Sequence, residues 1–325
     1  MTGGAGFIGS HYVRSLLGGR YPNSEDHVVT VLDKLTYAGN LANLAPVRDD
    51  SRLTFVEGDI LDTRLVDRLV GESEAVVHFA AESHVDRSIL GAADFVMTNV
   101  VGTETLLDAA LRHGTERFVH VSTDEVYGSI ESGSWPEEHP LRPNSPYSAS
   151  KAASDLLALA YARTHGVPVT VTRCSNNYGP YQFPEKVVPL FVTNLLDGGR
   201  VPLYGDGSNV RDWLHVDDHC RAVHLVLERG RPGEVYNIGG GTELSNKELT
   251  GLLLEACGAG WDAVDHVEDR KGHDQRYSVD ITKISTELGY RPEVPFDRGL
   301  AETVDWYRAN RAWWEPLKER AALAR

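Results

Sequence analysis

The 325-residue sequence has few cysteines, no long apolar run and no excess of positive charge. Its three cysteines, Cys174, Cys220 and Cys257, do not pair evenly and share no metal-ligand spacing, so a reducing cytoplasm is the simplest setting. The lack of a run of about 18 apolar residues excludes a membrane span, and we expect no signal peptide. The net charge of −15 argues against a nucleic-acid surface. It does not exclude a pyrophosphate ligand, which needs only a helix N-terminus and one or two arginines.

Short valine-rich runs alternate with helical stretches in the first half of the sequence. Gly, Asp or His bounds each run, which is typical of strands buried on both faces of a parallel sheet. Residues 94–113 have the apolar spacing of a helix that covers such a sheet. The alternation predicts an α/β fold with a Rossmann-like, doubly wound parallel sheet. The predicted strands are residues 28–32, 53–56, 75–79, 118–121 and 169–172.

The pattern changes after about residue 178, where four prolines between 180 and 202 interrupt the regular alternation. A further β-like run at 234–238 ends in three glycines, and helical stretches follow at 245–257 and 296–309. We therefore predict a first domain over residues 1–177 and a smaller C-terminal substrate-binding lobe over 178–325. Segments at about 210–240 are expected to return to the first domain.

The sequence opens on a glycine-rich turn, with glycines at positions 3, 6 and 9. Glycine lets the backbone approach a pyrophosphate, and the N-terminus of the helix that follows supplies N–H groups and partial positive charge. A strand ending in Asp33 follows, at about the distance of the acid that binds the adenosine ribose of dinucleotides. Because an acid there disfavours the extra phosphate of NADP, we predict NAD, although such turns can also be purely structural.

Only Met1 and Thr2 precede this turn, whereas the fingerprint normally follows a complete central strand. Without that strand, buried ladder groups on both neighbouring strands would lack partners, at about 1–3 kcal/mol each. We therefore expect the natural chain to begin some residues earlier. An intact mass of the native protein that matched this sequence from Met1 would contradict this expectation.

Tyr147 and Lys151 stand four residues apart, in a YxxxK spacing. On a helix these positions share a face, so the phenol and the ammonium can meet one substrate. A nearby cation favours phenolate, so we predict a lowered pKa for Tyr147. The phenolate could then take a proton from a sugar hydroxyl while NAD takes the hydride. Isolated YxxxK matches are common, but a serine at the end of an upstream strand, Ser122, favours a functional pair.

Two adjacent carboxyl groups, Asp124 and Glu125, follow that strand. Oxidation of C4 of a sugar to a ketone makes the C5 proton acidic. One carboxylate can then remove this proton while a protonated carboxyl group donates to the departing C6 hydroxyl. A solvated acidic pair is about as plausible for these residues alone. The setting of Tyr147, Lys151 and the glycine turn favours dehydration.

Thr2 to Gly9, Asp33, Ser122 and Tyr147 to Lys151 together resemble the extended short-chain dehydrogenase/reductase family. Five further segments are similar to the nucleotide-sugar 4,6-dehydratases that act on dTDP-glucose. The resemblance implies oxidation at C4, loss of water across C5 and C6, and hydride return to C6, so that NAD is regenerated within each turnover. The five segments are residues 80–88, 122–128, 176–181, 184–186 and 269–274.

The resemblance also implies roles for single residues: Asp124 as the acid, Glu125 as the base, and Thr123 as a hydrogen-bond donor to the C4 oxygen. It implies a homodimer joined by two helices per subunit, for which 94–113 and the helix carrying Tyr147 are the candidates. The predicted catalytic residues are Thr123, Asp124, Glu125, Tyr147 and Lys151. The predicted cofactor contacts are Gly3, Gly6, Phe7, Ile8, Gly9, Asp33, Lys34, Thr36, Asp59, Ile60, Phe79, Ala80, Ala81, Ser83, Thr98, Tyr147, Lys151 and Asn177.

Substrate contacts are expected mainly from the second lobe. Arg211 and Arg270 suit a diphosphate, because a planar fork of donors fits phosphate oxygens, although Arg211 could instead pair with Asp212. The predicted substrate contacts are Ser83, Thr123, Asn176, Lys186, Val187, Pro202, Tyr204, Arg211, Asn246, Arg270, His273 and Tyr277.

Two other functions are compatible with parts of this sequence. A nucleotide-sugar 4-epimerase would share Tyr147, Lys151 and the NAD site but would not need a carboxyl pair at 124 and 125. A non-catalytic NAD-binding protein would need none of these side chains. No metal site is expected, because no histidine has a partner at ligand spacing.

Overall fold

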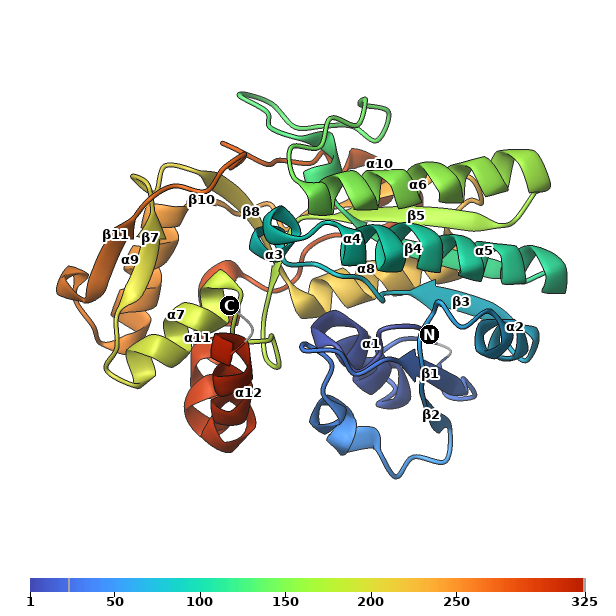
Figure 1. Cartoon of the computed structure of the whole chain (residues 1–325), viewed down its shortest axis with the longest axis horizontal. Helices are drawn as coiled ribbons and strands as arrows, with labels where there is room; N and C mark the ends of the chain where they lie inside the picture. The colour runs from blue at the N-terminus through green and yellow to red at the C-terminus, as the bar shows by residue number, and fades with distance from the viewer. Residues whose placement is uncertain (23, 324–325) are drawn as a thin grey trace.

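The computed structural model describes residues 1–22 and 24–323. A parallel sheet with helices on both faces forms the larger part of the molecule, and a smaller lobe adjoins one end of it (Figure 1). The order of the strands is β2-β1 and β3-β4-β5-β9, and Thr2 forms bridges to both Leu32 of β1 and His78 of β3. The predicted α/β, doubly wound fold is therefore confirmed. The strands are β1 (Val29–Asp33), β2 (Leu53–Glu57), β3 (Ala75–His78), β4 (Arg117–Thr123), β5 (Val169–Cys174) and β9 (Val235–Ile238).

Met1 and Thr2 occupy the centre of the sheet, where the sequence predicted a missing strand. The Thr2 N–H donates to Val77 O at 3.1 Å, and the Leu32 N–H donates to Met1 O at 2.8 Å. The terminal amino group donates to Thr30 O at 2.8 Å. These two residues therefore satisfy ladder groups on both neighbouring strands, immediately before the glycine turn.

Two sets of helices cover the two faces of the sheet (Figure 1). One apolar cluster joins α1 and α8 to the sheet, and another joins α2, α5 and α6 to it. Helix α6 begins sharply because Pro146 stands in its first turn and Ser145 forms a capping box with Ser148. This start places Tyr147 in the first turn. The helices are α1 (Phe7–Leu17), α2 (Thr63–Gly71), α5 (Gly102–His113), α6 (Pro146–His165) and α8 (Val216–Arg229).

The helix predicted over 94–113 is interrupted. Helix α4 (Ala93–Phe95) leads into a π-helical turn, η2 (Val96–Val101), before α5. The buried Asn99 explains the bulge, because its side chain accepts from Glu82 N at 2.9 Å and donates to Glu82 O at 3.0 Å and Ser150 Oγ at 2.9 Å. Such bulges are frequent at functional sites. Through Asn99, the bulge connects the segment after β3 to helix α6 by hydrogen bonds.

The C-terminal lobe contains two small sheets, of order β10-β8-β6 and β11-β7. Helices α9 and α11 lie where the sequence predicted them, whereas α12 was not predicted. Strand β9 and helix α8 return to the large sheet. No helix of the described residues is long and apolar enough to cross a membrane. The remaining elements are β6 (Asn176–Tyr178), β7 (Val201–Tyr204), β8 (Val210–His215), β10 (Glu243–Ser245), β11 (Val264–Val267), α3 (Val85–Leu90), α7 (Val187–Leu196), α9 (Asn246–Cys257), α10 (Thr282–Leu288), α11 (Phe296–Ala309), α12 (Arg311–Leu323), η1 (Leu41–Val47), η3 (Asp124–Tyr127) and η4 (Trp261–Ala263).

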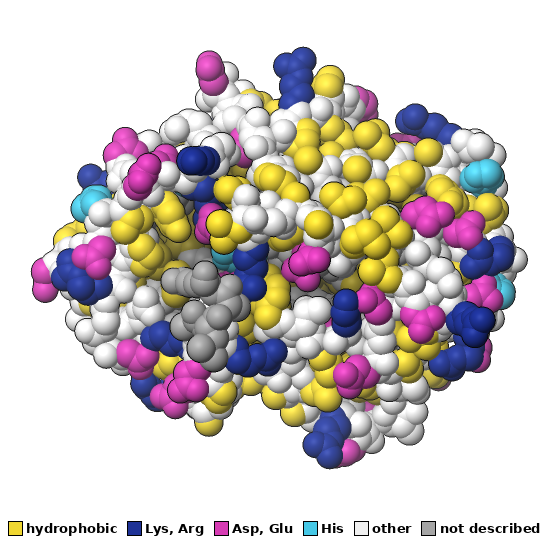
Figure 2. All heavy atoms as spheres, in the orientation of Figure 1, with side chains coloured by type: hydrophobic (Ala, Val, Ile, Leu, Met, Phe, Trp, Pro, Cys, Tyr) yellow, Lys and Arg dark blue, Asp and Glu magenta, His cyan; other side chains and the backbone are white. Residues whose placement is uncertain are grey.

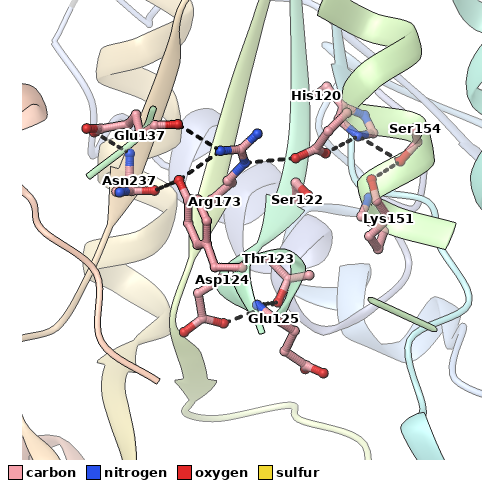
Figure 3. A network of polar contacts seen from close by, with 12 residues as sticks. His120, Ser122, Thr123, Asp124, Glu125, Glu137, Lys151, Ser154, Arg173 and Asn237 are labelled. Atoms are coloured by element: carbon pink, nitrogen blue, oxygen red, sulfur yellow. Dashed lines mark hydrogen bonds and ion pairs between the residues drawn. The ribbon is translucent and has the colours of Figure 1, made fainter. Parts of the chain in front are cut away.

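A buried ion pair connects α6 to the sheet (Figure 3). Arg173 Nε of β5 lies 2.9 Å from Asp155 Oδ2, and Nη1 of the same side chain donates to the Tyr127 hydroxyl at 2.8 Å. Burial acts to raise the pKa of Asp155, but His120 and Arg173 outweigh it and lower this pKa to about 2. The carboxylate therefore remains ionised inside the protein.

We predict that Asp155→Asn lowers the free energy of unfolding by about 3–5 kcal/mol at neutral pH, because it leaves Arg173 buried without a counter-charge. The pKa of Asp155 is lower in the folded chain, about 2, than its ordinary value of 3.8. Its stabilisation is thus complete above about pH 4 and is lost as the pH falls through about 2. Urea unfolding at several pH values measures both effects.

Glu302→Gln is the matched control, because Glu302 and Arg298 form an exposed pair 3.7 Å apart on α11. We expect this substitution to change stability by less than about 0.5 kcal/mol. Equal effects of the two substitutions would contradict the importance assigned to the buried pair.

Candidate active site

One cavity of about 720 Å³ lies between the carboxyl edge of the large sheet and the C-terminal lobe. The glycine turn, the end of β4 and the start of α6 line one part of it, and β7, β8 and the 270–277 segment line another. Every catalytic, cofactor and substrate residue predicted from the sequence lines this cavity. The structure thus brings together residues from positions 3 to 277.

The glycine turn is shaped for close approach by a ligand. Gly3 has a φ of +68°, and a Cβ there would lie 2.6 Å from Ala80 N. Helix α1 begins at Phe7, directly after the turn, and its N-cap, Gly6, provides no side-chain hydrogen bond. The first N–H groups of α1 therefore remain available, as a dinucleotide pyrophosphate requires.

The acid at the end of β1 fits the ribose of the same cofactor. Asp33 Oδ2 accepts from Ala5 N and Oδ1 accepts from Leu35 N, both at 2.9 Å. Each carboxylate oxygen keeps a further lone pair for a ribose hydroxyl. Lys34 does not offer a free cation for an extra phosphate, because its Nζ forms an ion pair with Asp59 Oδ2 at 2.6 Å. The residues present therefore fit NAD better than a cofactor with an extra phosphate on the ribose.

The two acids lie at the point where β4 ends and η3 begins (Figure 3). The Thr123 hydroxyl accepts from Glu125 N and donates to Asp124 Oδ1, both at 3.3 Å. Asp124 is only 1% exposed, and its Oδ2 has no hydrogen-bond partner among the described residues. Glu125 is half-buried. Adjacent in sequence, the two carboxyl groups therefore have different surroundings.

Their surroundings shift the two pKa values to different extents. Burial raises the pKa of Asp124 well above its ordinary value, and the negative charges of Glu125 and Asp212 raise it further. Burial also raises the pKa of Glu125, but the positive charges of Lys186 and Arg211 oppose this rise. The pKa of Asp124 is therefore raised further than that of Glu125, so Asp124 retains its proton to higher pH.

Tyr147 and Lys151 are both buried on the face of α6 that meets the cavity. Lys151 Nζ donates to Val121 O at 2.8 Å, and burial lowers the pKa of this lysine to about 8. The predicted lowering of the Tyr147 pKa is wrong. Burial and the nearby Glu125 raise the pKa of Tyr147 well above its ordinary value. The sequence indicated the positive charge of Lys151 near Tyr147, but it could not show that the Tyr147 hydroxyl is buried away from water.

The lobe supplies aromatic and cationic groups to the cavity. The Arg211 guanidinium lies 4.2 Å from the centre of the Tyr277 ring and donates to Asp274 O at 2.8 Å. Asp212, the alternative partner of Arg211, instead accepts from the N–H groups of Gly240 and Thr242, each at 2.9 Å. Arg211 is thus fixed by its stacking and backbone contacts.

Three polar contacts cross the cavity between the two parts of the molecule. No role was predicted for Asp86, Arg87 or Glu185, although all three lie in segments that carry the family resemblance. Sequence alone could not show that they face one another. The contacts join Lys186 Nζ to Ser83 O (2.6 Å), Arg87 Nη2 to Glu185 Oε2 (3.2 Å) and Arg270 Nε to Asp86 Oδ1 (2.7 Å).

Metal ligation has no candidate here. Across residues 1–22 and 24–323, no group of three or more His, Cys, Asp or Glu side chains could hold a metal ion.

Comparisons with known proteins agree on the family. The GDP-mannose 4,6 dehydratase family model matches residues 1–303. A dTDP-glucose 4,6-dehydratase of Streptomyces antibioticus is 70% identical over 326 residues, which cover 99% of this chain and 96% of the relative. Another, from Mycobacterium tuberculosis, is 50% identical, with 98% and 96% covered.

Solved structures give the same picture. The crystal structure of DesIV, a dTDP-glucose 4,6-dehydratase of Streptomyces venezuelae, contains NAD and a dTDP ligand. It is 67% identical, has a TM-score of 0.96, and the match covers 97% of this chain and 98% of DesIV. A UDP-glucose 4-epimerase of Thermotoga maritima is more distant, at 35% identity and a TM-score of 0.87, with 95% and 98% covered. The chain therefore belongs to the GDP-mannose 4,6 dehydratase family, as its resemblance to nucleotide-sugar 4,6-dehydratases predicted.

Proposed function

We propose that the chain is an NAD-dependent dTDP-glucose 4,6-dehydratase, a hydro-lyase of deoxysugar biosynthesis. It would convert dTDP-glucose into dTDP-4-keto-6-deoxyglucose and water. The observation that carries this proposal is the pair Asp124 and Glu125, held beside Tyr147 with pKa values raised to different extents. Relatives 64–70% identical to the chain bear this name, which supports the assignment.

The glycine turn, the start of α1 and Asp33 would hold NAD, which when bound takes a hydride from C4 of the sugar and gives it back to C6. Tyr147 removes the proton of the C4 hydroxyl, and Thr123 donates a hydrogen bond to the C4 oxygen. Lys151 carries a positive charge below about pH 8, which opposes the rise that burial causes in the pKa of Tyr147 and so favours its phenolate form.

The carboxyl pair then removes water from the C4 ketone. Glu125 takes the C5 proton, Asp124 gives its proton to the C6 hydroxyl, and this hydroxyl leaves as water while a C5–C6 double bond forms. The protonated Glu125 afterwards returns a proton to C5. The proton gained by Tyr147 leaves to solvent and Asp124 regains one, so both groups return to their starting states.

The substrate would lie between these groups and the lobe. Lys186, Arg211 and Arg270 supply positive charge for the diphosphate, and a planar guanidinium matches phosphate oxygens better than an ammonium does. Pro202 and Tyr204 supply an apolar surface for the base. We assign the remaining predicted contacts to the sugar and nucleoside: Ser83, Asn176, Val187, Asn246, His273 and Tyr277.

The test of function is incubation of the holoenzyme with dTDP-glucose, followed by mass spectrometry of the nucleotide sugar. We expect a product lighter by one water that develops the absorbance of a 4-keto sugar in alkali. A 4-epimerase, the alternative that the distant structural relatives represent, would leave the mass unchanged. An unchanged mass would therefore reject the dehydratase.

Substitutions should separate oxidation from elimination. We predict that Tyr147→Phe lowers the rate of oxidation by about 10²–10⁴-fold, because no base remains for the C4 hydroxyl. Asp124→Asn combined with Glu125→Gln should still oxidise C4 but retain the C6 hydroxyl. Absorbance of reduced cofactor under single-turnover conditions measures the first step, and mass spectrometry measures the second. Dehydration at the normal rate by the double variant would refute the assigned roles.

We also propose a homodimer formed by the two predicted helical segments. Figure 2 shows apolar side chains gathered over α4, α5 and α6, an exposed surface rarely left bare on a monomer. Leu156 of α6 is 60% exposed. The other exposed apolar residues of this patch are Val96, Met97, Val101 and Leu111.

Leu156→Glu should convert the dimer to a monomer, because it places a charge in the apolar interface. Light scattering coupled to gel filtration should give twice the 35.8 kDa of one chain for the wild type and 35.8 kDa for this variant. Leu252→Glu, at an exposed position on α9 of the lobe, is the control and should remain dimeric. A monomeric wild type would reject the dimer.

We further propose a cytoplasmic location and a domain boundary near residue 177. The three cysteines, none of them in a disulfide, fit a reducing compartment. The boundary rests on β6, which begins at Asn176 and pairs with β8 of the lobe immediately after β5 leaves the large sheet.

A further inference from the structure

Helix α12, the last element of the C-terminal lobe, packs against the nucleotide-binding domain. Leu317 and Ala321 of α12 are buried in an apolar cluster with Phe183, against which Tyr37 and Ala38 also pack. Ala38 and Ala321 both line the cavity. In Figure 1 this helix stands beside the segment that follows β1. A helix from the lobe therefore forms part of the wall around the predicted cofactor site.

A relay of two hydrogen bonds leads from this helix to the glycine turn. Trp313 Nε1 donates to Asn43 Oδ1 at 2.9 Å, and Asn43 Nδ2 donates to Ala5 O at 2.9 Å. Asn43 is almost fully buried, so its bond to Ala5 is shielded from water, while the bond from Trp313 is partly buried. Ala5 stands between Gly4 and Gly6, and its N–H donates to Asp33. Ala5 O also accepts from Asn40 N at 3.1 Å. The peptide group before Ala5 is thus fixed by Asp33 of β1, and the one after it by Asn40 N together with the relay.

Arg14 of helix α1 contacts both Asn43 and the lobe. Arg14 Nη1 donates to Asn43 O at 2.5 Å, and its guanidinium lies 4.1 Å from the centre of the Tyr181 ring. Tyr181 packs on Trp306 and Trp313, with ring centres 4.4 and 5.5 Å away. Helix α1 therefore contacts this aromatic cluster directly through Arg14, whereas the turn is joined to it through Asn43.

We propose that Trp313 and Asn43 are positioning residues for the cofactor turn, so that helix α12 of the lobe sets how long NAD stays bound. The relay holds Ala5 in the conformation that presents the turn and the first N–H groups of α1 to the pyrophosphate. Retention matters for this chemistry, because a cofactor that is restored in each turnover has no need to leave.

The test measures release of NAD in the absence of substrate, so its outcome does not depend on the proposed dehydratase activity. Holoenzyme loaded with labelled NAD is mixed with excess unlabelled NAD, and the loss of bound label gives the dissociation rate. Trp313→Phe keeps an aromatic ring but removes the donor to Asn43. We expect this variant to release NAD about tenfold faster, which corresponds to one net hydrogen bond.

Trp306→Phe is the matched control. Its ring packs 5.0 Å from that of Trp313, but its indole N–H is not part of the relay. We expect its NAD release rate to stay within about twofold of the wild type. Equal release rates for Trp313→Phe and Trp306→Phe would overturn the proposal, because the effect would then come from aromatic packing.

A double-mutant cycle tests whether the two residues act in series. Asn43→Ala removes both bonds of the relay and should also speed NAD release. Adding Trp313→Phe to Asn43→Ala should then have little further effect, since the relay is already broken. Independent, multiplicative effects would overturn the proposal. If Trp313→Phe does not fold, Asn43→Ala alone decides, because an unchanged NAD release rate in that variant excludes the relay.

Discussion

Removal of water from charged groups at the carboxyl edge of the parallel sheet shapes the chemistry of this cavity. Strand β4 carries Asp124 and Glu125 into a site where burial raises both pKa values. Arg211 of the lobe opposes this rise at both acids. Lys186 opposes it further at Glu125, whereas the carboxylate of Asp212 adds to it at Asp124. The same burial acts on Tyr147 and Lys151 in opposite directions. The charges that the lobe places beside each acid therefore make Asp124 retain its proton to higher pH than Glu125 does.

The two parts of the molecule depend on each other for function. The large sheet supplies the glycine turn and the acids, while the lobe supplies Lys186, which lowers the pKa of Glu125, and Asp212, which raises that of Asp124. Contacts such as Arg270 with Asp86 and Lys186 with Ser83 join the parts across the cavity. The relay through Asn43 extends this dependence to the cofactor turn. Cofactor and substrate would therefore be held by a single connected framework.

Motifs that are contiguous in sequence were predictable, because each folds locally in one way. The glycine turn, the acid ending β1 and the YxxxK helix are short patterns whose geometry follows from backbone sterics and helix periodicity. The fold class was predicted from the alternation of strands and helices, and the family from the resemblance of these motifs to known enzymes, and both are confirmed. The residue roles remain predictions, although all the residues line one cavity.

Features that depend on tertiary contacts were not predictable. The π-helical turn at 96–101 exists because Asn99 bonds to Glu82 and Ser150, which lie far from it in sequence. The pKa of Tyr147 was predicted in the wrong direction, since burial is a property of the folded chain. Helix α12 was not predicted. Its contacts are with residues 36–43, which lie near the other end of the chain.

The protonation state of Asp124 at neutral pH is the most direct test of the account. Infrared difference spectroscopy between the wild type and Asp124→Asn isolates the signal of this one carboxyl group. We predict the band of a protonated carboxylic acid in the wild type, which the variant lacks. The band of an ionised carboxylate at neutral pH would contradict the central claim, because Asp124 would then have no proton for the departing hydroxyl.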